Sequence, residues 1–224
     1  MMKIVLPLLI FSILFSCKAK HNIVDKPIIF KEERKQLTLA YLKNRYGLVQ
    51  EYPHITPKMI VLHWTAIPTL EKSFAAFNST TLPNWRPDIK QVSSLNVSTH
   101  FIVDRDGTTY RLLPETTMAR HVIGLNHCAI GIENVGGGEE GVPLTQKQLE
   151  ANIRLVKYLK KKYKSIQYLI GHYEYTLFKE TPLWLESDNN YRTIKTDPGK
   201  DFMQNVRTTV KDLNFKPLPI QPKS

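Results

Sequence analysis

The chain of 224 residues lacks the short motifs that identify many enzymes directly. It has no H-E-x-x-H zinc-protease motif, no G-x-S-x-G nucleophile elbow and no P-loop. It also has no internal repeat, no zinc-finger spacing and no RNA-binding signature. Any catalytic chemistry must therefore come from residues that the fold gathers from separate parts of the chain.

Cysteine is scarce, because Cys17 and Cys128 are the only two in the sequence. Cys17 follows an apolar run over residues 4–15, which has signal-peptide length and is too short to span a membrane comfortably. This arrangement resembles a bacterial lipoprotein signal; an ordinary signal peptide or an uncleaved anchor is the alternative. We expect a signal peptide over residues 1–16, lipidation of Cys17, a tether over residues 17–29 and a lipid-anchored location in the cell envelope. Cys128 then has no partner for a disulfide, and its apolar context indicates a buried small hydrophobe.

Acidic residues are fewer than basic ones, and the formal net charge is +11. Such a charge favours polyanionic surroundings: nucleic acid, anionic lipid or an acidic cell-wall polymer. Because nucleic-acid motifs are absent, we expect no nucleic-acid partner. We expect a monomer.

Short apolar runs alternate with helical patterns, which predicts an α/β fold. Strands are expected at residues 58–64, 129–135 and 166–170, and a hairpin at 97–113 that turns at Asp106-Gly107. Helices are expected at residues 30–47, 69–78, 145–163 and 202–213, the third opened by a Thr145–Gln148 capping box. The sequence thus predicts one mixed central sheet flanked by helices in a single domain over residues 58–213. A helical extension over residues 30–57 precedes it, and a flexible tail over 214–224 follows.

Four residues that can carry chemistry stand at or near the ends of predicted strands. His63 closes one strand, Glu133 lies in a second, His172 follows a third, and Asp197 follows the last long loop. Two histidines and a carboxylate are a common ligand set for catalytic zinc, and a second carboxylate can act as general base. Lys195 could then stabilise developing negative charge, although Lys195 and Asp197 alone could equally form a surface ion pair. Spacing leaves other ligands open: Asp201, His100, His121 and His127.

Five segments in this order resemble the motifs of the zinc-dependent N-acetylmuramoyl-L-alanine amidases, which include peptidoglycan-recognition proteins and phage-lysozyme-type amidases. The resemblance extends over residues 58–213 and rests on Ile60–Ala66, Ser98–Gly107, Ala129–Glu133, Gly171-His172 and Lys195–Gly199. It implies hydrolysis of the amide between N-acetylmuramic acid and L-alanine in peptidoglycan or muropeptides.

The resemblance also assigns roles to individual residues. It implies that His63, His172 and Asp197 bind Zn²⁺, that Glu133 activates the water and that Lys195 stabilises the oxyanion. It places His121 and Asn126 near the substrate. Thr99 stands where several relatives carry a Tyr, so His100 either takes part of that role or is a core residue, and Trp85 either borders the groove or packs.

Two other functions are compatible with this sequence. The same fold can serve as a non-catalytic muropeptide-binding module, and a zinc site could hydrolyse another amide. All three ligand positions and both auxiliary positions are filled here, which favours catalysis.

Overall fold

The computed structural model describes residues 22–84, 87–138 and 141–220. The predicted signal peptide, Cys17 and Trp85 lie outside these described residues. Among the helices that are described, none has the length and apolar character needed to cross a membrane.

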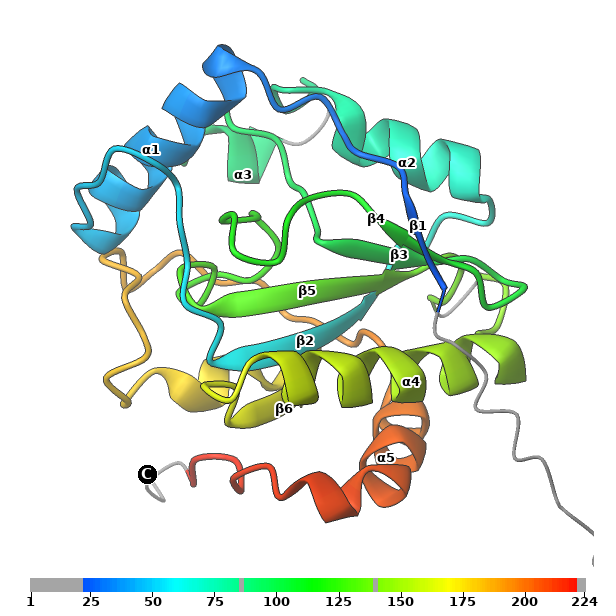
Figure 1. Cartoon of the computed structure of the whole chain (residues 1–224). Coiled ribbons are helices and arrows are strands. Elements are labelled where there is room, and N and C mark those ends of the chain that lie inside the picture. Colours follow the sequence, from blue (N-terminus) through cyan, green and yellow to red (C-terminus); the bar gives the residue numbers. More distant parts are fainter. Residues whose placement is uncertain (1–21, 85–86, 139–140, 221–224) are drawn as a thin grey trace, which may run out of the picture.

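A six-stranded mixed sheet forms the centre of the molecule, in the order β1-β4-β3-β5-β2-β6 (Figure 1). The strands are β1 (Ile23–Asp25), β2 (Met59–Trp64), β3 (Phe101–Val103), β4 (Thr109–Arg111), β5 (Ala129–Asn134) and β6 (Tyr168–Gly171). β3, β5, β2 and β6 are parallel to one another, whereas β4 is antiparallel to β3 and parallel to β1. The predicted α/β fold with a mixed central sheet is confirmed.

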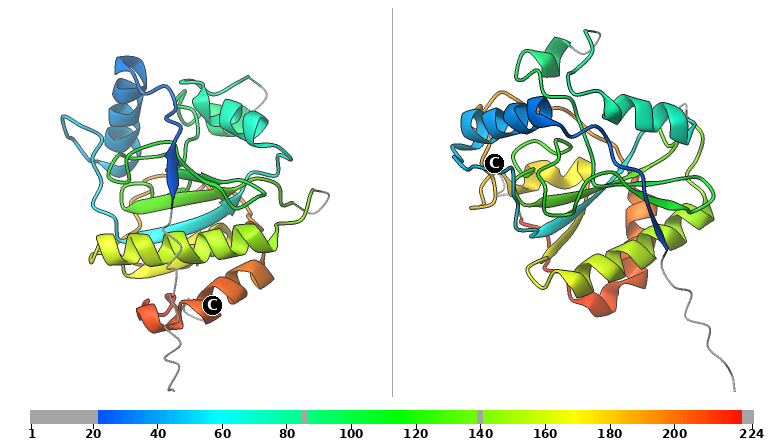
Figure 2. Two further views of the ribbon diagram at one scale, coloured as in Figure 1. Left: turned by 45° about the vertical axis from the view of Figure 1, so that its right-hand side comes forward. Right: turned by 45° about the horizontal axis from the view of Figure 1, so that its top comes forward.

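Helices cover both faces of this sheet, as Figures 1 and 2 show. On one face lie α4 (Gln146–Lys162) and α5 (Lys200–Thr209), followed by the 3₁₀ turn η2 (Lys211–Leu213). On the other lie α1 (Glu32–Tyr46), α2 (Leu70–Asn78) and the short α3 (Pro87–Lys90). The predicted capping box of α4 is present, and Gly47 ends α1 in the left-handed conformation with φ 68°.

The alternation of side chains along the strands separates core from site. Ile60 and Leu62 of β2, with Ile130 and Ile132 of β5, pack in the core formed with α4 and α5. Because side chains alternate along a strand, His63 and Glu133 point to the opposite face, toward α1 and α2. The central strands are hydrophobic runs since helices cover both faces, and the polar residues appear where the strands end.

Two of the predicted boundaries are wrong. The segment expected to be a tether contributes β1 at the edge of the sheet, and Ile28 is buried in the core. In the expected flexible tail, Phe215 packs against the core and the N–H of Lys216 donates to the carbonyl of Gln167 at 2.8 Å. Both segments are held because they bury apolar side chains and pair their backbone groups.

Candidate metal centre and cleft

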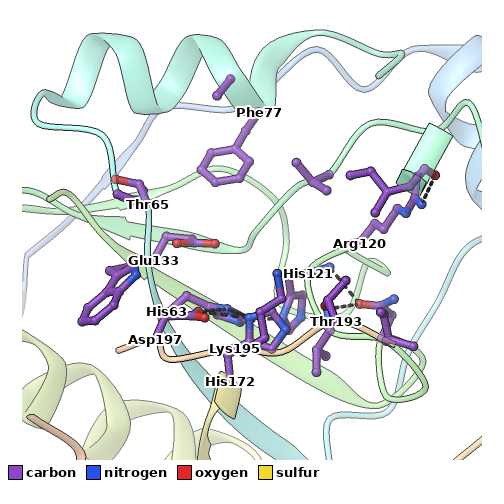
Figure 3. Close-up of a pocket in the computed structure, with 18 of the residues that line it drawn as sticks. His63, Thr65, Phe77, Arg120, His121, Glu133, His172, Thr193, Lys195 and Asp197 are labelled. Carbon is purple, nitrogen blue, oxygen red and sulfur yellow. Dashed lines mark hydrogen bonds and ion pairs between the residues drawn. The ribbon is translucent and has the colours of Figure 1, made fainter. Parts of the chain in front are cut away.

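Three side chains from distant parts of the chain meet at one edge of the sheet. His63 is the fifth residue of β2, and His172 follows β6 directly as the first residue of the 3₁₀ helix η1 (His172–Phe178). Because β2 and β6 are parallel neighbours, their carboxyl ends bring these two histidines together. Asp197 arrives from the loop before α5 (Figure 3).

The potential ligand atoms of these residues form a nearly equilateral triangle. The Nδ1 atoms of His63 and His172 lie 3.0 Å apart, and each lies 3.0 Å from Oδ2 of Asp197. All three side chains are buried, and within the described ranges they are the group of His, Cys, Asp and Glu residues that could hold a metal ion. Of the competing ligands, His100, His121, His127 and Asp201 stand outside this group.

The surroundings favour the protonation states that bind metals. Burial, helped by the neighbouring His63, lowers the pKa of His172 to about 4, although Asp197 acts in the opposite direction. Burial alone would raise the pKa of Asp197, but its contacts with His172 and His63 outweigh burial and hold that pKa well below its usual range. At neutral pH the site therefore presents a neutral His172 imidazole and an ionised Asp197, as metal binding requires.

A cleft of about 670 Å³ opens above this triangle, and Glu133 and Lys195 line it together with the three candidate ligands. Glu133 stands opposite His63 in the β2–β5 register, and its side chain is buried. Figure 3 shows its carboxylate above His63 and Asp197, below Thr65 and the end of α2. Lys195 is half-buried and reaches the same space from the loop that carries Asp197. A carboxylate, an ammonium and a potential metal site therefore face one cleft.

His121 lies beside the ligands and was expected to contact substrate. It lines the cleft, and its Nδ1 lies 3.0 Å from Nε2 of His63. Its Nε2 lies 3.3 Å from the carbonyl oxygen of Ala129. Both ring nitrogens thus have partners within the protein.

His100 is a core residue, so its expected contact with substrate is wrong. Its side chain has no exposed surface. Its Nδ1 accepts from the N–H of Gly131 at 3.0 Å, and its Nε2 donates to the carbonyl of Thr117 at 2.8 Å. The sequence left open whether His100 contacts substrate or packs in the core, and in the structure it packs in the core.

Asn126 lines the cleft, and its side-chain amide has hydrogen-bond partners within the protein. Its Oδ1 accepts from the N–H groups of His121 and Val122, at 2.8 and 2.7 Å. Its Nδ2 donates to the hydroxyl of Tyr46 on α1 at 2.8 Å. Asn126 therefore ties the loop that carries His121 to the N-terminal helix.

Sequence reasoning missed the group that holds His172. Glu174, on the first turn of η1, accepts from the N–H of Gly171 at 2.8 Å and pairs through both carboxylate oxygens with Arg207 of α5. Arg207 also donates to the carbonyl of Leu169 at 3.0 Å. No local motif links residues that are 33 positions apart, so the pattern of the sequence carried no signal for this pair.

Trp64, the residue after His63, is enclosed by glycines. A Cβ on Gly137 would lie 2.5 Å from the Trp64 side chain, and one on Gly199 would lie 3.3 Å from it. Both glycines have positive φ, of 76° and 88°. Gly137, in the middle of three consecutive glycines at 136–138, thus makes room for this indole.

A family model described as N-acetylmuramoyl-L-alanine amidase matches residues 53–200, which is more than half of the chain. The chain belongs to the N-acetylmuramoyl-L-alanine amidase family. The matched segment contains every candidate ligand, Glu133 and Lys195. Among curated proteins the chain has no match.

Solved structures of amidases share this fold. The N-acetylmuramoyl-L-alanine amidase LysC from Clostridium intestinale is 23% identical with a TM-score of 0.50, over 87% of this chain and 99% of that chain. The endolysin LysCS from the same organism is also 23% identical, with a TM-score of 0.51 over 87% and 97% of the two chains. A human PGRP-Iβ structure in complex with a glycosamyl muramyl pentapeptide is 19% identical, with a TM-score of 0.48 over 70% and 86%.

Proposed function

We propose that this member of the amidase family is a zinc enzyme that hydrolyses the amide between N-acetylmuramic acid and L-alanine in peptidoglycan or its fragments. The observation that carries the proposal is the buried triangle of His63, His172 and Asp197 in a cleft that also presents Glu133 and Lys195. Two imidazoles and one carboxylate are a ligand set of catalytic zinc sites, which keep a fourth position open.

The ligand separations support the fit to zinc. Zinc binds histidine nitrogen and carboxylate oxygen at about 2.0–2.2 Å, so tetrahedral ligand atoms lie roughly 3.3 Å from one another. The three atoms here are 3.0 Å apart, and a small expansion of the triangle accommodates the ion. Zinc, when bound, would supply Lewis acidity and lower the pKa of a water molecule.

The residues of the chain itself would handle the proton and the developing charge. Glu133 takes a proton from the attacking water and passes it to the amine nitrogen of L-alanine as the C–N bond breaks. Lys195 donates a hydrogen bond to the carbonyl oxygen as that oxygen gains negative charge. The cleft above the sheet edge holds the scissile amide between these two groups.

The proposal places the enzyme in the cell envelope, held by a lipid on Cys17. The support is the apolar run at residues 4–15 followed by Cys17, together with a net charge of +11 that suits an anionic wall polymer. We expect the protein to act as a monomer and to have no nucleic-acid partner.

The test is cleavage of purified muropeptides by the protein with zinc and after chelation, with the products identified by mass spectrometry. We expect free stem peptide and peptide-less sugar in the presence of zinc only. Binding of muropeptide by the zinc-loaded protein without cleavage would replace the enzyme with a muropeptide-binding module.

Two variants separate metal binding from chemistry. Glu133→Gln should retain zinc but lose about 10²–10⁴-fold in kcat, because the group that moves the proton is gone. Asp197→Asn should lose zinc affinity itself. Glu71→Gln, at an exposed position of α2, is the matched control and should leave both quantities unchanged. Full activity of the Glu133 variant would remove that residue from the mechanism.

A further inference from the structure

His63 is held at both ring nitrogens, and only one arrangement of its proton allows it to bind a metal. A neutral imidazole carries one N–H donor and one lone pair. The Nδ1 atom of His63 faces His172 and Asp197, whereas its Nε2 faces His121. His63 can offer Nδ1 as a ligand only when its proton sits on Nε2.

A backbone carbonyl determines where that proton sits. The oxygen of Ala129 can only accept, so the Nε2 of His121, 3.3 Å away, must be the N–H donor. The Nδ1 of neutral His121 is then a lone pair, which accepts from Nε2–H of His63 at 3.0 Å. This relay puts the lone pair of His63 on Nδ1, at the centre of the ligand triangle. Ionised Asp197, 3.0 Å from the same Nδ1, favours the opposite tautomer in the metal-free protein, and the relay from Ala129 is what opposes it. Metal-binding histidines commonly have their other nitrogen fixed in this way.

The ring of His121 is itself fixed by its neighbours. Gly131, on the β5 face that also carries Glu133, leaves the space for it, since a Cβ there would lie 2.8 Å from Cγ of His121. Asn126 holds the backbone N–H of His121 and is tied to Tyr46 of α1. The ring therefore cannot turn away from His63 without disturbing the strand or the loop.

We infer that His121 is a positioning residue that fixes the metal-binding tautomer of His63, with the carbonyl of Ala129 as the origin of the hydrogen-bond relay. This inference rests on the proposed metal site. It replaces the expected role of His121 as a substrate contact, because both of its nitrogens serve the relay. Its effect is on metal affinity rather than on substrate affinity.

The tautomer can be measured directly in the metal-free protein. Long-range ¹⁵N–¹H NMR correlations distinguish Nδ1–H from Nε2–H imidazoles, and we expect His63 to be the Nε2–H form. His121→Asn, whose side-chain oxygen can take the place of Nδ1 as acceptor, should preserve that form. His121→Leu removes the acceptor and should give a mixture. An Nδ1–H form in the wild type, or an unchanged spectrum in His121→Leu, overturns the inference.

Zinc affinity, measured by competition with a chelator, provides the second readout. His121→Leu should weaken zinc binding by about 10–100-fold, as loss of such a partner typically does, and His121→Asn should stay close to the wild type. Gly131→Ala keeps the histidine but displaces its ring, so it should weaken zinc binding as well. Far-UV circular dichroism of the metal-free variants checks that each one folds.

The outcomes separate the inference from the proposed function. A wild type that binds no zinc refutes the zinc enzyme, while the NMR tautomer still tests the relay. A wild type that binds zinc, with His121→Leu and Gly131→Ala binding equally tightly, refutes the relay alone. A raised KM with unchanged zinc affinity would return His121 to the role of substrate contact.

Discussion

Substitution of His100 by Gln tests whether this histidine belongs to the core or to the site. Burial lowers the pKa of His100 to about 4, even though the carbonyl of Thr117 and the nearby Glu115 act in the opposite direction. An unfolded histidine titrates near 6.5. The unfolded chain therefore takes up a proton as the pH falls through about 6.5, and the folded chain takes it up only near 4. The stability that His100 contributes is complete above pH 6.5 and is lost as the pH falls from 6.5 to 4.

The magnitude follows from the shift in pKa. A separation of about 2.5 units, at 1.36 kcal/mol per unit, amounts to roughly 3 kcal/mol over the whole window. Within that window the free energy of unfolding changes by about 1.4 kcal/mol per pH unit for each proton taken up by the unfolded chain alone. The slope for His100→Gln should be lower than that of the wild type by up to this amount. Loss of the acceptor for the N–H of Gly131 adds a constant cost of about 1–3 kcal/mol, which does not depend on pH.

The assay is urea unfolding of both proteins at a series of pH values from 4.5 to 7.5, with chelator present so that metal binding does not contribute. The buried His172 is present in both proteins, so its effect cancels in the difference. His100 helps to lower the pKa of His121, so loss of that coupling is part of the measured difference. Parallel curves for the two proteins would show that His100 titrates alike in the folded and unfolded states. That result would refute its assignment to the core.

Two further substitutions test the supports of the site, each against a matched control. Arg207→Met leaves the buried carboxylate of Glu174 without its cation, so it should lower the free energy of unfolding by about 2–4 kcal/mol and weaken zinc binding. The control is Arg154→Met, which removes an exposed ion pair with a separation of 4.0 Å and should cost less than about 1 kcal/mol. Equal losses in urea unfolding would contradict this ranking. Gly137→Ala places a methyl group 2.5 Å from Trp64 and should lower the melting temperature clearly. Gly47→Ala is the control, because φ is also positive there but nothing lies within 4 Å of the added methyl group. The control should cost only about 1–2 kcal/mol of backbone strain and lower the melting temperature much less. Similar melting temperatures would mean that the indole moves at no cost.

The residues at the strand ends could be predicted because two simple patterns cross there. Runs of branched apolar residues predict buried strands, and a histidine or glutamate that interrupts such a run must have a partner or a task. His63, Glu133 and His172 were found in this way, and Asp197 followed from its place after the last loop. The five segments in order then identified the family that the comparison confirms.

For His100 and His121, sequence patterns do not predict where the side chain lies. His100 stands in the predicted hairpin and His121 in the stretch between that hairpin and the next strand, and no periodicity reveals the direction of either side chain. His100 points into the core and His121 points toward the ligands because of contacts with residues 8–58 positions away. Such contacts depend on register and side-chain direction, which a single sequence does not encode locally. The edge strand β1 escaped prediction for the same reason, since three residues cannot display alternation.

The supports of the metal centre come from outside the segment that defines the family. The family match ends at residue 200 and begins at residue 53, but His172 is held through Arg207, and the loop of His121 is held through Tyr46. Both supports act on backbone and on ring orientation, and small errors in either have large effects on a metal site. The segment that matches the family contains the candidate ligands, whereas groups on the first and last α-helices support the segments that carry His121 and His172. A fragment cut at the limits of the match would keep every candidate ligand and lose the groups that hold two of the three histidines around the cleft in place.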